Sequence, residues 1–391
     1  SPLHNTGLTM GYFDGNTETV HWNYAQRVTL SVNSFGSTFG PSTPGAINLV
    51  SGQTNGIKET RNGKGGLTDG GHGSLTMIED PNPLGDICSA PTQEQVSLGG
   101  RNIGDMLSEA GVTWGWFQGG FNLTIQNPNG TSGCKRSTVS PISGKPVLDY
   151  SPHHEPFQYY ESTANLEHAR PASIKTIGHN GDPANHQYDT EDFFAALKAG
   201  NFPAVSFLKA PAYQDGHAGY SNPLDEQTFV VKVINFIQQR PEWKNTAVII
   251  AYDDSDGWYD HVMGEIMNGS ESKLDALDGE GKCGNGSTAI GGVDPTSKHV
   301  YGRCGFGPRL PLLVISPWAK PNYVDHTVTD QTSIARLIED IFLNGRRLGQ
   351  GSFDANSGSL NGMFDFSEDK PSNLRKVFLD PETGLVKSVQ R

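Results

Sequence analysis

The sequence predicts an α/β fold with a largely parallel central sheet, helices on both sides of it and long loop insertions. Short runs of apolar, mostly β-branched or aromatic residues alternate along the chain with segments whose apolar residues repeat at helical spacing. Strands that are apolar along their whole length are typical of a sheet covered on both faces. Neither an internal repeat nor a linker interrupts the alternation, so residues 1–391 are expected to form one domain.

Four apolar runs are predicted to be strands of this sheet: residues 111–117, 204–208, 247–252 and 312–315. Helices are predicted over residues 102–110, 190–198, 225–239 and 332–343, where apolar side chains fall on one face. A Gly or Pro follows each of these segments within two residues, as expected at a helix end. The alternation of the two kinds of segment is the basis of the predicted fold class.

Two regions do not fit the alternation. Residues 262–308 are rich in Gly, Ser, Asn and Asp and are predicted to form a loop insertion. Residues 353–391 are polar with little periodicity and are predicted to form a polar C-terminal segment.

The charge balance argues against two classes of partner. The net charge is −13 and no block of Lys and Arg occurs, whereas nucleic acids and anionic membranes favour basic patches. No apolar stretch is as long as a membrane span and no signal-peptide pattern is present, so we expect no stable membrane insertion. An acidic chain that binds a phosphate ester needs a local cation, and a metal ion is the natural candidate.

The four cysteines are predicted to form two local disulfides, Cys88–Cys134 and Cys283–Cys304, each of which would pin a long loop. Four reduced thiols are the alternative, and zinc is disfavoured because no CxxC motif occurs. Disulfides would place the protein in a periplasm or outside the cell.

Two adjacent carboxylates, Asp253 and Asp254, follow the apolar run 247–252. Ligands collect at the carboxyl ends of strands in an open sheet, and two neighbouring carboxylates repel each other unless a cation lies between them. Oxygen ligands favour Ca²⁺, Mg²⁺ or Mn²⁺, whereas zinc usually recruits His or Cys as well. The alternative is that the pair only caps a turn leading into Gly257.

Ser42 lies in the segment Gly-Pro-Ser-Thr-Pro-Gly and is the candidate nucleophile. A hydroxyl in a turn stiffened by proline is expected to be exposed and aimed, and a neighbouring metal would lower its pKa. Thr43 is the rival nucleophile, and Ser or Thr beside Pro often marks only a turn.

Three loop histidines are candidates for phosphate contact or for proton transfer to the leaving alcohol. His217 precedes a Pro/Asn turn, and His153 and His154 are adjacent in another loop. A loop histidine taken alone is more often a surface residue.

These motifs resemble the bacterial phospholipase C/acid phosphatase family of the alkaline phosphatase superfamily. The matching segments run in family order from residue 9 to residue 345 and include 40–45, 201–207, 217–223, 243–262 and 309–320. The Ser-Thr-Pro-Gly turn together with the Asp-Asp pair is most similar to the acid phosphatase branch.

The resemblance implies an alkaline-phosphatase-like fold and a role for each candidate. Ser42 would be the phosphorylated nucleophile and a metal ligand, and Asp253 and Asp254 would be further ligands of a divalent ion (Ca, Mg, Mn or Zn). His217 and His154 would contact the phosphate or act as acid and base, with His153 as the alternative to His154.

The chain departs from the family pattern at its start. The family normally begins with a strand followed by a Glu-Asn-Arg-Ser-Phe-Asp-like segment that binds the same metal, and nothing similar precedes Ser42. We therefore expect this domain to lack its N-terminal strand and ligand segment, which a separate N-terminal fragment could supply.

The sequence therefore predicts a metal-dependent phosphoric ester hydrolase of the acid phosphatase type that works on small phosphate esters through a phosphoserine. The alternatives are a phospholipase C acting on phospholipid head groups and a non-catalytic, secreted scaffold stabilised by metal. A sulfatase is disfavoured because its formylglycine needs a Cys or Ser in a different motif.

Overall fold

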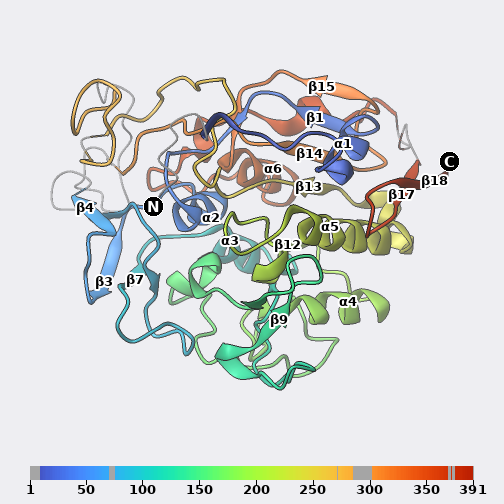
Figure 1. Cartoon of the computed structure of the whole chain (residues 1–391), viewed down its shortest axis with the longest axis horizontal. Helices are drawn as coiled ribbons and strands as arrows, with labels where there is room; N and C mark the ends of the chain where they lie inside the picture. The colour runs from blue at the N-terminus through green and yellow to red at the C-terminus, as the bar shows by residue number, and fades with distance from the viewer. Residues whose placement is uncertain are drawn as a thin grey trace.

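The structure, a computed structural model, describes residues 9–69, 75–270, 272–284, 302–368, 371 and 375–390. These residues form six α-helices. Their bounds are α1 Thr19–Ala25, α2 Ser42–Ser51, α3 Ile103–Glu109, α4 Thr190–Lys198, α5 Pro223–Gln238 and α6 Thr332–Phe342 (Figure 1). The four helices expected from apolar periodicity are α3 to α6, with ends within two residues of the predicted ones. Periodicity did not reveal α1 or α2.

The strands form several small sheets. Two of them position the site. The first has the strand order β13-β14-β1-β15, with β13 Val248–Ile250, β14 Leu312–Ile315, β1 Thr29–Ser31 and β15 Tyr323–Asp325. The second has the order β11-β8-β12, with β11 Gln187–Tyr188, β8 Trp114–Gln118 and β12 Val205–Lys209. The peripheral strands are β2 Ser34–Phe35, β3 Ile57–Arg61, β4 Leu67–Asp69, β5 Leu75–Met77, β6 Asn82–Pro83, β7 Gln95–Leu98, β9 Ser137–Val139, β10 Pro146–Leu148, β16 Thr329–Asp330, β17 Lys376–Leu379 and β18 Val386–Gln390.

The mixed α/β class is confirmed, but the central sheet differs from the single, largely parallel sheet that the sequence predicts. β8 pairs in parallel with both β11 and β12. In the other sheet, β14 pairs antiparallel with β13 and with β1, and only β1 and β15 run parallel. The apolar runs identify these strands as buried but carry no information on their direction, because a strand covered on both faces has the same composition either way.

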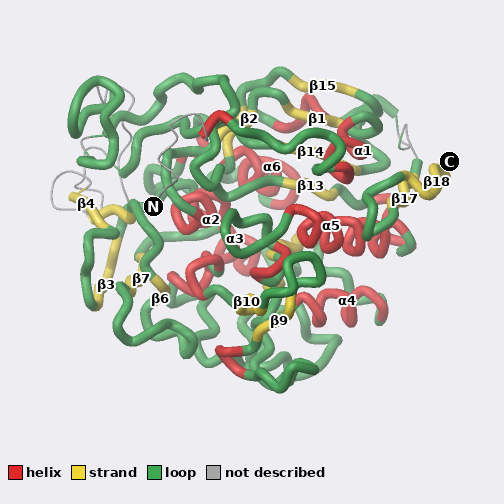
Figure 2. The backbone as a smooth tube through the Cα atoms, viewed as in Figure 1, coloured by secondary structure: helices red, strands yellow, loops and turns green. Residues whose placement is uncertain are grey.

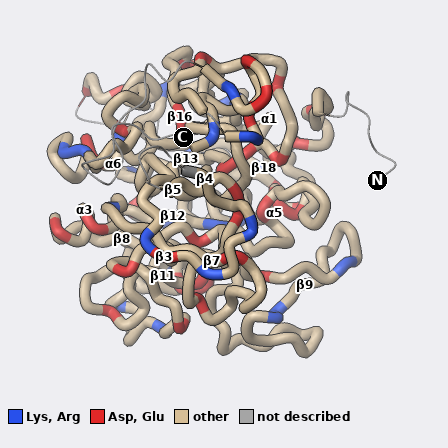
Figure 3. The backbone as a smooth tube through the Cα atoms, turned by 90° about the vertical axis from the view of Figure 1, so that its left-hand side faces the viewer, with Lys and Arg blue, Asp and Glu red and all other residues tan. Residues whose placement is uncertain are grey.

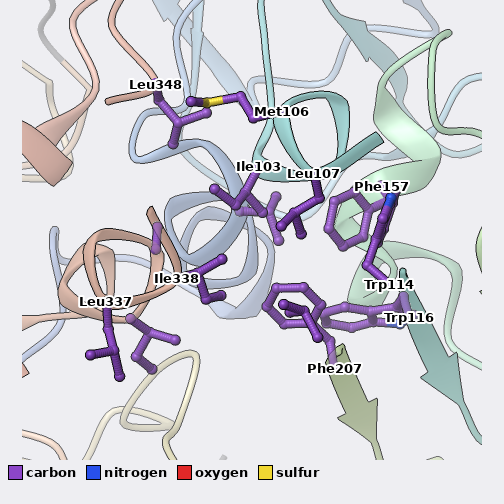
Figure 4. Packing of buried hydrophobic residues seen from close by; sticks show 14 of the residues in the cluster. Ile103, Met106, Leu107, Trp114, Trp116, Phe157, Phe207, Leu337, Ile338 and Leu348 are labelled. Atoms are coloured by element: carbon purple, nitrogen blue, oxygen red, sulfur yellow. The ribbon is translucent and has the colours of Figure 1, made fainter. Parts of the chain in front are cut away.

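Two hydrophobic clusters lie on opposite sides of these two sheets. Along β14, Leu312 and Val314 belong to one cluster while Leu313 and Ile315 belong to the other, as alternation along a strand requires. The first cluster includes residues of α2, α3 and α6, and the second includes residues of α1, α4 and α5. Figure 4 shows the first cluster, in which Ile338 of α6 faces the aromatic rings of β8 and β12. Helices therefore cover the sheets on both sides.

Helix ends agree with the local sequence. Asn102 and Asp105 form a capping box at the start of α3, and Asp189 and Asp192 form another at the start of α4. Asn222 caps α5, whose first residue is proline. These caps satisfy backbone N–H groups that a helix cannot pair internally.

The disulfides are Cys88–Cys134 and Cys283–Cys304, the two pairs that the sequence predicts. Within the described residues of 262–308, only isolated bridges occur, and the second disulfide links two parts of this segment. In the segment 353–391, β17 and β18 pair into a hairpin, and the buried Val377 and Leu379 pack in the second cluster. Figure 2 shows that loops make up much of the remaining chain.

Among the described helices, none combines the length and the apolar character that crossing a bilayer requires. Lys and Arg positions are scattered among Asp and Glu in the view of Figure 3, consistent with the absence of a basic block in the sequence.

Candidate active site

Ser42 is the first residue of α2. The sequence interpretation places its hydroxyl in an exposed turn, and this is wrong, because the residue starts a helix of ten residues and is only 5% exposed. Its Oγ donates a hydrogen bond to Oδ2 of Asp254 over 2.6 Å. Pro at the third helical position and Gly at the fourth suggest a turn in the sequence, but proline is tolerated in the first turn of a helix. The partial positive charge of a helix N-terminus favours an anion at this place.

Asp253 and Asp254 lie just beyond β13, as the sequence predicts. Burial and the neighbouring charge of Asp253 raise the pKa of Asp254 to about 6. Asp256, in the left-handed region with φ of 51°, donates its backbone N–H to Asp254 Oδ1. The carbonyl oxygen of Asp253 accepts a hydrogen bond from Gln331 over 2.5 Å. These contacts fix the acidic pair against α2 and α6.

Lys209, the last residue of β12, contacts the acidic pair from the other sheet. Its Nζ lies 2.7 Å from Oδ2 of Asp253. Burial lowers the pKa of Lys209, but the charges of Asp253 and Asp215 outweigh this effect, so its pKa is raised above the usual value. Sequence reasoning missed this lysine, although its position at the carboxyl end of a predicted strand is a signal that could have found it.

His154 is almost completely buried and faces Asp215, with 3.5 Å between Nδ1 and Oδ2. Burial lowers the pKa of His154 well below its usual value, and the charge of Lys209 lowers it further, so the ring is neutral. Burial also raises the pKa of Asp215 to about 6. Nε2 of His154 has no hydrogen-bond partner among the described residues. A buried ring nitrogen without a partner is a candidate contact for a bound ligand.

His217 and His153 differ in their relation to the site. Nε2 of His217 lies 3.5 Å from Oδ1 of Asp256, and its ring stacks on that of Tyr220. His153 packs edge-on against His154, and its carbonyl oxygen accepts a hydrogen bond from Oγ1 of Thr43. The rival nucleophile Thr43 thus has its hydroxyl engaged in a backbone contact.

One pocket brings most of the predicted residues together. Its lining comprises Ser42, His154, Lys209, Asp215, Gly216, His217, Tyr252, Asp253, Asp254 and Asp256. Five of the predicted site residues are among them, from segments more than two hundred residues apart, whereas His153 lies beside His154 and not in the lining. Asp215 and Asp256 were not predicted, although each lies within two residues of a predicted one.

The pocket offers a donor set that fits a hard cation. Ser42 supplies a hydroxyl oxygen and Asp253 and Asp254 supply carboxylate oxygens, the donors that Ca²⁺, Mg²⁺ and Mn²⁺ prefer. Burial and the neighbouring charge of Asp253 raise the pKa of Asp254, and a cation in the pocket would offset both effects. One of these oxygens is in contact with the ammonium group of Lys209.

Asp86, Cys88 and His168 form a second group of possible ligand atoms, all within 4.8 Å of one another. Cys88 is bound to Cys134 in a disulfide and therefore offers no thiolate. Oδ2 of Asp86 already lies 3.1 Å from His168, and it also accepts hydrogen bonds from a tyrosine and a glutamine. This group is a buried hydrogen-bond network and does not fit a metal ion.

Residues 2–343 match the family model described as the phosphoesterase family. The chain belongs to the phosphoesterase family. This match confirms the family that the sequence motifs indicate.

Relatives of this phosphoesterase include phospholipases C from several bacteria. The chain is 32% identical over 37% of its length to a non-hemolytic phospholipase C of Pseudomonas aeruginosa and 27% identical over 64% to a non-hemolytic phospholipase C of Burkholderia pseudomallei. It is 24% identical over 97% of its length to phospholipase C B of Mycobacterium tuberculosis. The matches cover 20%, 33% and 61% of these relatives, so the phosphoesterase chain spans less than two thirds of each.

A solved structure titled for glycosaminoglycan metabolism by Bacteroides thetaiotaomicron is 13% identical to this phosphoesterase, with a TM-score of 0.42. The superposition covers 99% of this chain and 79% of the other, and no functional conclusion follows from a TM-score this low. The relatives above are named phospholipases C, so membership of the acid phosphatase branch stays a prediction.

Proposed function

We propose that the chain carries the catalytic centre of a phosphoric ester hydrolase in which Ser42 is the nucleophile. The observation that carries the proposal is the contact of 2.6 Å between Ser42 Oγ and Asp254 at the first residue of α2. A nucleophile with an adjacent acceptor for its proton is the usual arrangement for covalent catalysis. The start of a helix stabilises the negative charge of a phosphoryl group.

The roles of the other residues follow from their contacts. Asp254 orients the Ser42 hydroxyl and accepts its proton while Oγ attacks phosphorus and the ester bond to the alcohol breaks. His217, beside the carboxylate of Asp256, is the candidate to protonate the departing alcohol, whereas the neutral ring of His154, beside Asp215, is a candidate contact for the bound phosphate. Lys209 offsets the negative charge of the pocket. Water then cleaves the phosphoserine and regenerates the hydroxyl.

A divalent ion fits the same pocket, with Ser42, Asp253 and Asp254 as the residues that would hold it. When bound, such an ion polarises phosphoryl oxygens and lowers the pKa of a coordinated hydroxyl. The two disulfides support a periplasmic or secreted location for this chemistry, because disulfides persist in oxidising compartments.

Replacing Asp254 with asparagine is expected to weaken divalent-ion binding at least about tenfold, because a neutral amide removes one charged ligand. Isothermal titration with Ca²⁺, Mg²⁺, Mn²⁺ and Zn²⁺ measures the affinities. Asp215→Asn is the matched control, since Asp215 lies in the same pocket but is not a proposed ligand. Equal affinity in Asp254→Asn and the unsubstituted chain, or an equal loss in the control, contradicts the assignment.

The substrate class divides into two candidates. The names of the relatives favour a phospholipid head group, which a phospholipase C cleaves as a phosphodiester. The acidic chain without a basic block favours small soluble phosphomonoesters, as in an acid phosphatase.

Turnover of p-nitrophenyl phosphate and of phosphatidylcholine vesicles by the same preparation, with each divalent ion added, separates these candidates. Faster release of choline phosphate supports the phospholipase C, and faster release of nitrophenol supports the phosphomonoesterase. A bound ion with no hydrolysis of either substrate rejects the proposed function and supports a metal-stabilised scaffold.

A further inference from the structure

The hairpin formed by β9 and β10, residues 137–148, presents an apolar face to solvent. Its pairing register places Val139, Pro146 and Leu148 on the same face, because side chains alternate along each strand. Val139, Leu148 and Ile142, which lies in the turn, are each about half exposed. Large apolar side chains that are exposed this close together mark an interaction surface.

A second exposed apolar region lies at the start of the described chain. Tyr12 is 81% exposed, Phe13 is also exposed, and no residue from 9 to 13 is charged. The ring of Phe13 lies 6.3 Å from that of Trp258, measured between centroids. We call this region the aromatic edge, and its other exposed members are Met10, Val262 and Met263.

Both regions are attached to loops that line the pocket of the candidate site. The backbone N–H of Ala212, in the segment that leads to Asp215, donates to the carbonyl oxygen of Asp149 at the end of the hairpin over 2.9 Å. The backbone N–H of Tyr259, beyond the acidic pair, donates to the carbonyl oxygen of Thr9 over 2.7 Å. In Figure 3, β9, α5 and α1 lie toward the right-hand side, whereas α3 and α6 lie toward the left. The hairpin and the aromatic edge therefore belong to the same side of the molecule as the helix that follows the site loop.

The charge of these regions fits a phospholipid surface. No Asp or Glu occurs from residue 110 to residue 148, although the net charge of the chain is −13. Lys135 and Lys145 are exposed beside the apolar face of the hairpin, whereas Arg136 is buried in ion pairs. Lysine reaches lipid phosphate groups while apolar neighbours enter the acyl boundary, and aromatic side chains favour the same interface. Two separate apolar edges on one side of a molecule suit a flat surface better than a compact protein partner.

We propose that the hairpin and the aromatic edge bind the surface of a zwitterionic phospholipid bilayer and turn the site pocket toward it. The contact is peripheral, because side chains enter only the headgroup region and no segment crosses the bilayer. A zwitterionic surface has no net charge to repel an acidic chain, unlike the anionic membranes that the charge balance disfavours. Action of the docked pocket on lipid rests on the proposed function, whereas the docking itself does not.

Vesicle binding tests the docking surface directly. The 391-residue chain is mixed with sucrose-loaded phosphatidylcholine vesicles in EDTA, which withholds the divalent ion, and the bound fraction is measured by sedimentation. We expect the chain to bind, and a variant that combines Ile142→Glu and Leu148→Glu to bind about tenfold more weakly or less, because binding scales with the apolar area that enters the interface. Phe13→Glu is expected to weaken binding to a similar degree. All three side chains are exposed, so these substitutions leave the folded core intact.

Ile341→Glu is the matched control, because Ile341 is 57% exposed on α6, away from the hairpin in Figure 3. We expect it to bind within about twofold of the unsubstituted chain. Equal binding of the hairpin variant and the unsubstituted chain, or an equal loss in the control, overturns the proposal. Binding only to anionic vesicles that about 0.5 M NaCl abolishes also overturns it, because charge alone then accounts for the contact. Self-association that the same substitutions remove, without vesicle binding, assigns the surface to a second copy of the chain instead.

Two forms of one lipid test the orientation of the pocket. With the divalent ion present, we expect the hairpin variant to hydrolyse phosphatidylcholine vesicles about tenfold more slowly and dissolved short-chain phosphatidylcholine within about twofold of the unsubstituted rate, because a dissolved lipid needs no docking. Equal losses on both forms overturn the orientation toward the bilayer. If the unsubstituted chain hydrolyses neither form but binds vesicles, the proposed function fails while the docking surface stands.

Discussion

Replacing Ser42 with alanine is expected to reduce hydrolysis of the better substrate by about 1,000-fold or more. The change removes the attacking oxygen and leaves only the electrostatic groups of the pocket. Losses of this size or larger are typical when the nucleophile of an enzyme is removed. The buried hydroxyl has one acceptor, Asp254, so alanine also leaves that carboxylate without its hydrogen bond. Initial rates with saturating substrate measure the loss, and intact mass spectrometry of acid-quenched reactions tests for the phosphorylated chain.

Thr43→Ala is the control for this prediction. Its hydroxyl contacts the carbonyl oxygen of His153, so we expect a rate within about tenfold of the unsubstituted chain and an unchanged phosphorylated species. The assignment of the nucleophile is wrong if Ser42→Ala keeps the rate while Thr43→Ala loses it. It is also wrong if the phosphoryl group is found on the threonine.

Replacing Gly45 with alanine is expected to lower the free energy of unfolding by about 3 kcal/mol or more. A Cβ at this position would lie 1.8 Å from the carbonyl oxygen of Asp253, far closer than any stable contact. The clash involves backbone on both sides, so a rotamer change cannot relieve it. α2 would have to move away from the acidic pair, and Ser42 would move with it.

Urea denaturation followed by tryptophan fluorescence measures the change in stability. Gly63→Ala is the matched control, because a Cβ there meets nothing nearer than 3.6 Å. We expect the control to change the free energy of unfolding by less than about 1 kcal/mol. Similar stability of Gly45→Ala and the unsubstituted chain would falsify the close approach of α2 to the acidic pair.

Much of the candidate site could be predicted because its residues have strong local signals. Asp253 and Asp254 follow an apolar run that reads as a strand, and the carboxyl end of a strand is a known position for ligands. Helix α6 was predicted with an end within one residue because apolar spacing and a following glycine agree. The two disulfides were predicted because each pair closes a local loop.

The missed features depend on contacts between distant segments. Lys209 follows a predicted strand, but its partner cannot be read from the sequence, because only the fold brings the ends of β12 and β13 close enough for its ammonium group to meet Asp253. The Gly and Pro residues around Ser42 indicate a turn, and tertiary packing of Ile47 and Val50 overrides that preference and makes the segment a helix. Strand direction also has no local signal when both faces are apolar.

The charged groups of the candidate site come from two separate sheets. Asp253 and Asp254 follow β13 of one sheet, whereas Lys209 ends β12 of the other. No strand pairing among the described residues joins the two sheets, which are held together by side-chain packing of α2, α5 and α6 and by the ion pair of Lys209 with Asp253. The spacing of charge in the pocket therefore depends on hydrophobic packing between the two sheets, which denaturants weaken.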